Sequence, residues 1–154
     1  MITAWRIVKT KHKRTAFSGH GTQFASGRWH HQMVPMVYCS GSLALAALET
    51  FVHLQDDGKH IHYQVYEIKI PVRLVLQVES VAALPKFWRK QPPGAATKKI
   101  GSDWIASAAS AVLGVPSAIV PQERNYLLNP YHPEFIKITI GTPGPFRFDP
   151  RLWK

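Results

Sequence analysis

The chain has 154 residues, 45% of them hydrophobic and 18% charged, which fits a single globular domain and excludes a disordered chain. Its 19 Lys and Arg against 9 Asp and Glu give a formal net charge of +10, so we expect a polyanionic partner or ligand: nucleic acid, an acidic protein or a phosphate-bearing small molecule. No apolar run approaches the roughly 18 residues of a membrane span, and residues 1–14 lack the apolar core of a secretory signal, so we expect a cytoplasmic protein without membrane contact.

Apolar periodicity in the first third of the chain predicts two strands and one helix. Residues 2–8 alternate loosely, as an opening strand does, and residues 36–38 form a short apolar run suited to a buried strand. Between them, the small and polar residues within 10–27 predict a loop. Strong helix formers over residues 43–52, with Ser42 as N-cap, predict a helix that is apolar nearly all round and therefore buried on most faces.

The middle of the chain carries a clear strand pattern. Apolar residues alternate within residues 61–70, and a slip at Val65-Tyr66 indicates a bulge or a change of face. Alternation resumes over residues 74–78, which predicts another strand. Residues 86–90 predict a single helical turn, closed by the Pro-Pro-Gly sequence that follows.

The last third of the chain predicts one more helix and several short strands. Residues 97–113 carry apolar side chains at helical spacing, with Gly114 as C-cap. Residues 123–133, dense in polar residues and Pro, predict an ordered turn. The remaining strand candidates are residues 117–120, 135–140 and 146–148. Strands in runs, few helices and no regular βαβ alternation predict a single compact α+β domain with a mixed or antiparallel sheet.

Three residues are candidates for chemistry. Glu49 is the only charged residue of the apolar helix, and it either faces solvent or enters a polar pocket, because a buried unpaired carboxylate is costly. Arg28, between Gly27 and Trp29, either has a structural role or presents its planar fork to a phosphate or carboxylate. Ser117 has no Gly-x-Ser-x-Gly elbow around it, so a hydrolase nucleophile is not expected.

Five motifs, taken in order, resemble the RES domain family. They are Gly27-Arg28-Trp29, Val37-Tyr38-Cys39-Ser40, Leu45-Ala46-Ala47-Leu48-Glu49, Val115-Pro116-Ser117-Ala118 and Glu123-Arg124-Asn125-Tyr126-Leu127-Leu128-Asn129-Pro130-Tyr131-His132-Pro133. The likeness runs from Trp5-Arg6-Ile7 to Phe148-Asp149-Pro150-Arg151-Leu152 and implies one RES domain over residues 1–154. The Arg, Glu and Ser for which the family is named correspond to Arg28, Glu49 and Ser117.

The resemblance implies a fold similar to that of ADP-ribosyltransferases and a toxin of a type II toxin–antitoxin module. Such a toxin takes NAD⁺ as its substrate and needs no further cofactor. It cleaves the nicotinamide–ribose bond, with water or phosphate as acceptor, and depletes cellular NAD⁺. The implied partner is an Xre-type antitoxin that covers the active site and through which alone the toxin meets nucleic acid. The oligomeric state is left open, a homodimer included.

The resemblance also implies roles for single residues. Cleavage of an N-glycosidic bond passes through an oxocarbenium-like state that a fixed carboxylate stabilises, which is the role of Glu49. Arg28 would clamp the pyrophosphate, and Tyr38 would pack on the nicotinamide or orient the ribose. Further contacts to the substrate are expected from Ser117, Asn125 and Arg6. The family usually continues Gly-Arg-Trp with Asn, where this chain has His30. His30 either replaces that Asn through a ring nitrogen or alters the Arg28 clamp.

Two other functions compete with NAD⁺ cleavage. One is transfer of ADP-ribose to a protein, within the same fold. The other is a non-enzymatic nucleic-acid-binding module, which the net charge of +10 suggests. The basic residues form three short clusters, within residues 9–14, 86–90 and 98–99, and no helix-turn-helix, zinc-finger or aromatic RNA-binding motif accompanies them, so the third function ranks last.

The metal-ligating residue types do not form a known zinc pattern. His30-His31 and His60/His62 lack the His-Glu-x-x-His spacing, so no catalytic metal is expected. Cys39 is the one cysteine and cannot form an internal disulfide, and we assign it to core packing.

Overall fold

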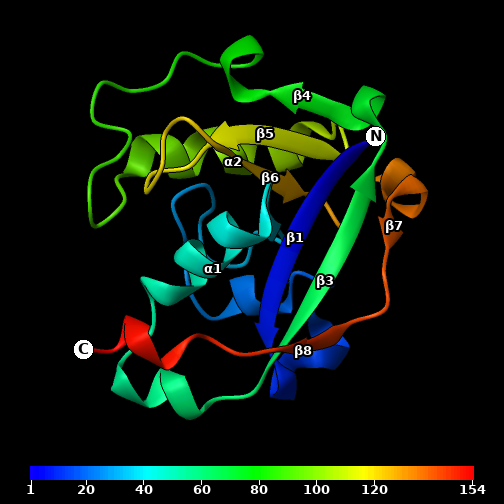
Figure 1. Cartoon of the computed structure of the whole chain (residues 1–154). Helices are drawn as coiled ribbons and strands as arrows, with labels where there is room; N and C mark the ends of the chain where they lie inside the picture. The colour runs from blue at the N-terminus through cyan, green and yellow to red at the C-terminus, as the bar shows by residue number, and fades with distance from the viewer.

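Eight strands form one sheet and two helices pack beside it, which confirms the α+β prediction (Figure 1). The computed structural model describes all of residues 1–154. The strands are β1 (Ile2–Lys9), β2 (Val37–Ser40), β3 (Tyr63–Ile70), β4 (Val75–Gln77), β5 (Val112–Pro116), β6 (Arg124–Leu128), β7 (Thr139–Ile140) and β8 (Gly144–Phe146), and the helices are α1 (Leu43–Phe51) and α2 (Ala95–Ser107). None of the helices has the length and apolar character needed to cross a membrane.

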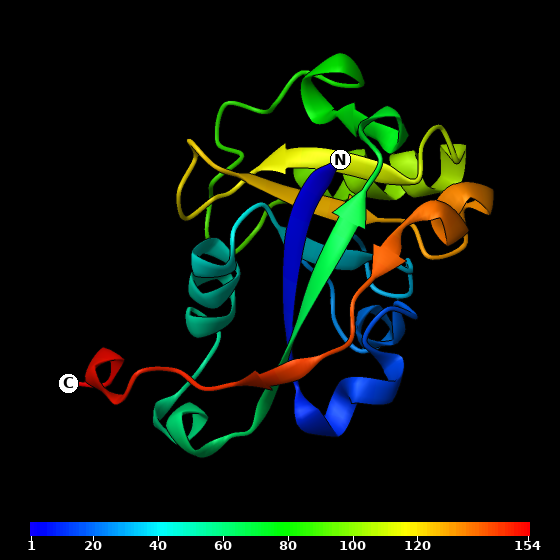
Figure 2. The same cartoon turned by 45° about the vertical axis from the view of Figure 1, so that its right-hand side comes forward.

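The sheet consists of two halves that meet at one point. Its order is β4-β5-β6-β2-β1-β3-β7, with β8 also paired to β3, and only β4 and β5 are parallel. β1 pairs with β3 along its whole length, whereas β1 and β2 share a single registered pair, Trp5 with Ser40. Because the ladder is so short there, the sheet turns sharply, and Figures 1 and 2 show β1 and β3 running steeply across β5 and β6.

Helix α1 begins where the sequence predicts. The hydroxyl of Ser42 accepts a hydrogen bond from the Leu45 amide at 3.1 Å, which confirms the N-cap. Only Leu45 and Ala46 of the helix are buried, while Leu48 and the C-cap Val52 are exposed. The prediction of burial on most faces was therefore wrong. One face of α1 packs against β1 and β2, and the opposite apolar side faces solvent.

Strand β3 changes its buried face without a bulge. Its register with β1 is unbroken from Tyr63 to Ile70. Tyr66, Ile68 and Ile70 contribute to the central core, whereas Tyr63 lies on the other face, in a cluster with Phe148. Of the two readings of the slip at Val65-Tyr66, the change of face is confirmed.

The second helix is shorter than predicted. α2 ends at Ser107, where Ala108 adopts a left-handed conformation with φ 51°. Residues 112–116 are strand β5, buried at every position, and Gly114 lies inside this strand rather than at a helix end. A strand buried on both faces has no alternation, so its apolar run resembles a continuing helix.

The segment after β5 also differs from the prediction. Residues 117–120 form no strand, and strand β6 stands at Arg124–Leu128 where an ordered turn was predicted. β6 pairs on both sides, with β5 and with β2. Polar Arg124 and Asn125 conceal a strand that tertiary pairing stabilises.

Of the other predicted elements, the turn, the loop and the last strand are present with shifted bounds, whereas the strand predicted at residues 135–140 was mostly wrong. Residues 85–90 make one helical turn, since the amides of Trp88 and Lys90 donate to the carbonyls of Pro85 and Phe87. The loop predicted for residues 10–27 contains two short 3-10 turns, Thr10–Thr15 and His20–Gln23. Near the C-terminus, the predicted strand at 135–140 is mainly a 3-10 turn, Pro133–Lys137, followed by the two residues of β7, and β8 ends at Phe146.

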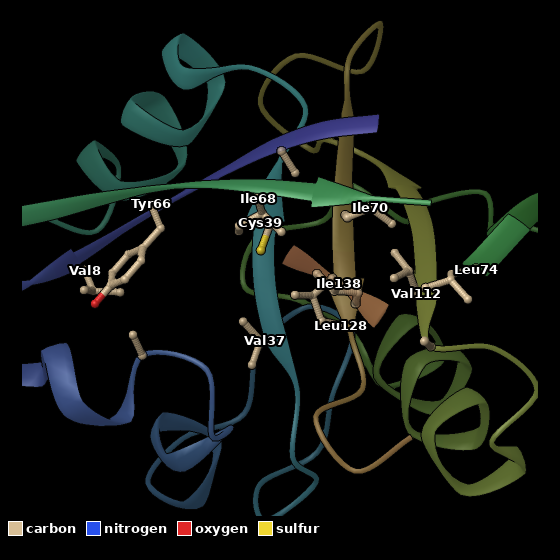
Figure 3. Packing of buried hydrophobic residues seen from close by; sticks show 13 residues of the cluster. Val8, Val37, Cys39, Tyr66, Ile68, Ile70, Leu74, Val112, Leu128 and Ile138 are labelled. Carbon is tan, nitrogen blue, oxygen red and sulfur yellow. The ribbon is translucent and has the colours of Figure 1, made fainter. Parts of the chain in front are cut away.

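The largest core lies between the two halves of the sheet. Figure 3 shows Val37 and Cys39 of β2 facing Ile68 and Ile70 of β3, with Leu128 of β6 beside them. A second cluster, including Trp29 and Trp104, packs α2 on β5. The three apolar clusters leave the space between α1, β1 and the loop before β2 for a cavity lined by both polar and apolar residues.

Candidate active site

A cavity of about 1290 Å³ opens where the two halves of the sheet diverge. Its wall comes from β1, the loop of residues 12–29, β2, the second half of α1, and the ends of β5 and β6. Five of the six predicted site residues line it: Arg6, Arg28, Tyr38, Glu49 and Asn125. The fold thus brings together residues that are far apart in the sequence, from Arg6 to Asn125.

Glu49 is the anchor of a hydrogen-bond network on this wall. Its Oε1 accepts hydrogen bonds from the Ser117 hydroxyl and from Asn125 Nδ2, both at 2.7 Å. Its Oε2 accepts none from the protein. The side chain is half-buried and lines the cavity, so the alternative in which Glu49 enters a polar pocket is confirmed. One carboxylate oxygen is fixed, and the other is free to meet a ligand.

Ser117 supports Glu49 from behind the cavity wall. The residue has no exposed surface and is absent from the cavity lining. Its hydroxyl donates to Glu49 and accepts hydrogen bonds from the amides of Ile119 and Val120, each at 3.1 Å. A strand followed at once by a tight turn places this hydroxyl directly behind the carboxylate. Ser117 therefore acts through Glu49, and a direct contact between Ser117 and substrate stays a prediction.

Ser40 is a site residue to which sequence reasoning assigned no role. Its hydroxyl donates to Asn125 Oδ1 at 2.7 Å, so that Asn125 is held at its oxygen while its nitrogen holds Glu49. Ser40 and Asn125 are opposite each other in the ladder between β2 and β6. This contact could have been found only by predicting that β2 pairs with a strand at residues 124–128. The sequence pattern predicts a turn at 123–133 instead.

Arg28 is tied to the helical turn at residues 85–90 and to Gln91 directly after it. Its Nη1 donates to the carbonyls of Trp88 and Lys90 at 2.7 and 2.9 Å, and its Nη2 donates to Gln91 Oε1 at 3.2 Å. Burial lowers the pKa of the guanidinium, and nearby Glu49 opposes that shift. Nε makes no hydrogen bond, so the Nε edge of the fork remains available to an anion in the cavity.

His30 pairs with Tyr38 and not with Arg28. His30 Nδ1 lies 2.6 Å from the Tyr38 hydroxyl, His30 Nε2 lies 3.0 Å from the Ala25 carbonyl, and the Trp29 amide donates to the Tyr38 hydroxyl at 3.3 Å. Burial lowers the pKa of His30 and raises that of Tyr38, so both rings are neutral near pH 7. Gly27 is required beside them, because a Cβ at this position would lie within 3 Å of both side chains.

Arg6 crosses between β1 and β2 at the back of the cavity. Its Nε donates to the Ala16 carbonyl at 2.7 Å and its Nη1 to the Tyr38 carbonyl at 2.8 Å. Burial lowers the pKa of this guanidinium. The thiol of Cys39 is buried nearby, and burial raises its pKa to about 12. Arg6 thus fixes the backbone of Tyr38, and Cys39 lies in the core.

The sequence matches the model of a known protein family. The model of the RES domain family, described as "RES domain", matches residues 3–149. This chain therefore belongs to the RES domain family.

Three relatives that are similar to this chain over nearly its whole length are named as toxins. It is 36% identical over 149 residues to "Toxin Res" of Yersinia enterocolitica serotype O:8 / biotype 1B, a match that covers 96% of this chain and 97% of the relative. It is 38% identical to "Toxin Res" of Photorhabdus laumondii subsp. laumondii over 97% of this chain and 96% of the relative. It is 37% identical to the "Prs ADP-ribosylating toxin" of Sphingobium sp. over 96% of this chain and 94% of the relative.

The fold has a solved counterpart. One chain of the crystal structure of the M.tuberculosis MbcT-MbcA toxin-antitoxin complex superposes with a TM-score of 0.72, at 11% sequence identity, covering 94% of this chain and 84% of that chain. At this level of identity the match establishes the shared fold.

Proposed function

We propose that this chain is the toxin of a toxin–antitoxin pair and that it cleaves the nicotinamide–ribose bond of NAD⁺. The observation that carries the proposal is the carboxylate of Glu49, fixed at Oε1 by Ser117 and Asn125 and open at Oε2 on the wall of a large cavity. A volume of about 1290 Å³ exceeds the ~300–1,000 Å³ of common small-molecule pockets and is sufficient for a dinucleotide.

The fixed carboxylate suits this bond. When nicotinamide leaves as a neutral group, positive charge develops on the ribose, and a preorganised negative charge stabilises that state without reorganising. Because Ser117 and Asn125 both bind the same oxygen, Oε2 keeps its full capacity to face the ribose or one of its hydroxyl groups.

Arg28 supplies the complementary positive charge. Its Nε–H and the adjacent Nη2–H form a side-on pair that fits two phosphate oxygens. The only side-chain partner of Nη2 is Gln91, which is exposed and can yield to the pyrophosphate. Asn125 keeps one amide hydrogen for the substrate, while Arg6 contributes charge from the back of the cavity.

The accepting group is water or phosphate, and an antitoxin of the Xre type restrains the toxin in the cytoplasm. The relatives named as toxins and the toxin–antitoxin complex with the same fold support such a pair. A second candidate is transfer of ADP-ribose to a protein, which the relative named "Prs ADP-ribosylating toxin" favours. Both reactions break the same bond and need the same carboxylate.

The test is release of nicotinamide from NAD⁺ by the purified chain, with and without phosphate, compared with a Glu49→Gln variant. We expect release by the wild type and a loss of about 10³-fold in Glu49→Gln, since the amide keeps the shape but not the charge. Glu67→Gln, the same change at an exposed carboxylate of β3, is the matched control and should retain wild-type activity.

Three outcomes separate the candidates. Release that accelerates with phosphate identifies phosphate as the acceptor, and release unaffected by phosphate identifies water. If labelled ADP-ribose appears only on added protein, the second candidate holds. An unchanged rate in Glu49→Gln would contradict both.

A further inference from the structure

The other hydrogen-bond partners of His30 and Tyr38 determine which of these two side chains donates to the other. A carbonyl oxygen only accepts, so the contact between His30 Nε2 and the Ala25 carbonyl requires the proton on Nε2. In the neutral ring Nδ1 then carries a lone pair, and at 2.6 Å it accepts the hydrogen of the Tyr38 hydroxyl. The Tyr38 oxygen in turn accepts from the Trp29 amide.

This arrangement determines what Tyr38 can offer to a ligand. Its only hydrogen is used by His30, and its oxygen has one remaining lone pair. Tyr38 lines the cavity that also holds Glu49 and Arg28. It can therefore accept a hydrogen bond from the ligand but cannot donate one.

Resting on the proposed function, we infer that His30 is a positioning residue: by taking the Tyr38 hydrogen at Nδ1, it presents the Tyr38 oxygen to NAD⁺ as a hydrogen-bond acceptor only. The ligand group that fits is a donor, such as a ribose hydroxyl or the carboxamide N–H. His30 itself is 5% exposed and acts through Tyr38.

Protonation of His30 reverses the pair. Nδ1–H would then donate to the Tyr38 oxygen, and the Tyr38 hydrogen would turn toward the ligand, where it meets another donor. The groups around His30 are Tyr38 on β2, Arg6 on β1, His20, the adjacent His31 and Lys98 on α2. None of them is a carboxylate. Burial lowers the pKa of His30 from its ordinary value, the hydrogen bond to the Ala25 carbonyl opposes this shift, and Lys98 and His31 add to it. Activity should therefore be full at neutral pH and fall as the pH drops through that lowered value.

The test is a double-mutant cycle on nicotinamide release with His30→Phe, Tyr38→Phe and the double variant. We expect His30→Phe to lower kcat/KM about tenfold, the effect of one well-placed hydrogen bond. In the Tyr38→Phe background the same change should cost less than twofold, because its target is gone. An equal loss in both backgrounds would mean that His30 only packs, and would overturn the inference.

Two further variants control for folding. His30→Asn offers an amide oxygen to Tyr38 and should recover activity to within about threefold of the wild type, without the acid limb of the pH profile. His31→Phe, the same change at the adjacent exposed imidazole, should keep wild-type kcat/KM at pH 8. If His30→Phe does not fold, the pH profile of Tyr38→Phe decides: a persisting acid limb contradicts the inference, and its loss supports it.

A readout independent of catalysis separates this inference from the proposed function. Nitrogen NMR of the His30 ring at pH 7.5 should show hydrogen on Nε2 and a hydrogen-bonded lone pair on Nδ1. A hydrogen on Nδ1 would overturn the inference even if NAD⁺ is cleaved. If the wild type releases no nicotinamide and modifies no protein, the proposed function fails, whatever the NMR result.

Discussion

The two charged ends of the cavity are supported by different kinds of structure. Glu49 is held by Ser117, which directly follows β5, and by Asn125 on β6, and Ser40 on β2 holds Asn125 in turn. Arg28 is held by main-chain carbonyls of a surface loop at residues 88–90. A network on paired strands fixes a carboxylate in one place, whereas a loop allows the guanidinium to follow its anion.

The difference teaches where precision is needed. Bond cleavage depends steeply on the position of the charge beside the ribose, so a rigid support is expected there. In the proposed reaction, holding the pyrophosphate tolerates movement, because the phosphates take no part in bond cleavage. Substitutions at three residues break or sharpen this comparison.

Among these, removing the Arg28 guanidinium should have the largest effect. Arg28→Ala eliminates the proposed phosphate contact and the loop anchor together, and we expect kcat/KM to fall about 10²-fold, mostly through KM. Arg28→Lys keeps the charge without the fork and should recover only part of the loss. Steady-state kinetics of nicotinamide release measures both variants. A fall in kcat alone would place Arg28 at the reacting bond instead.

Ser117→Ala should have an intermediate effect on the other end. Glu49 loses one of its two fixing hydrogen bonds, and the amides of Ile119 and Val120 lose their acceptor. We expect kcat to fall about tenfold with KM nearly unchanged, and the free energy of unfolding to drop by about 1–3 kcal/mol. Kinetics and chemical denaturation test this together. A rise in KM with kcat preserved would indicate that Ser117 contacts the substrate directly.

Gln91→Ala should have the smallest effect. It frees Nη2 of Arg28 from its side-chain partner but leaves both main-chain anchors in place. We expect KM to change by no more than about twofold and the free energy of unfolding by less than about 0.5 kcal/mol. A loss comparable to that of Arg28→Ala would show that the loop, and not the guanidinium, positions the substrate.

The sequence predicts the first half of the site better than the second. The Ser42 cap and the helix that carries Glu49 follow from local rules of capping and composition, and the structure has both, although only one face of the helix is buried. Strands β5 and β6 cannot be recognised from local patterns of apolar and polar residues. β5 is buried on both faces and has no alternation, while β6 carries Arg124 and Asn125 where a strand would ordinarily show apolar residues.

The site residues divide in the same way. Resemblance to a family indicates which residues matter, namely Arg28, Glu49, Ser117 and Asn125, but it does not say which of them holds another. Ser40 could be recognised only from the pairing of β2 with β6, and the partner of His30 only from the contact with Tyr38. Both are contacts between residues on different elements, which propensity and spacing do not encode.

Ser40 takes part in two separate contacts. It is the residue of β2 that meets Trp5 in the single pair joining the sheet halves, and its hydroxyl begins the chain of contacts that leads through Asn125 to Glu49. Ser40 thus both joins the two halves of the sheet and supports the Glu49 carboxylate. A change in the angle between the two halves would therefore shift the support of Glu49 as well.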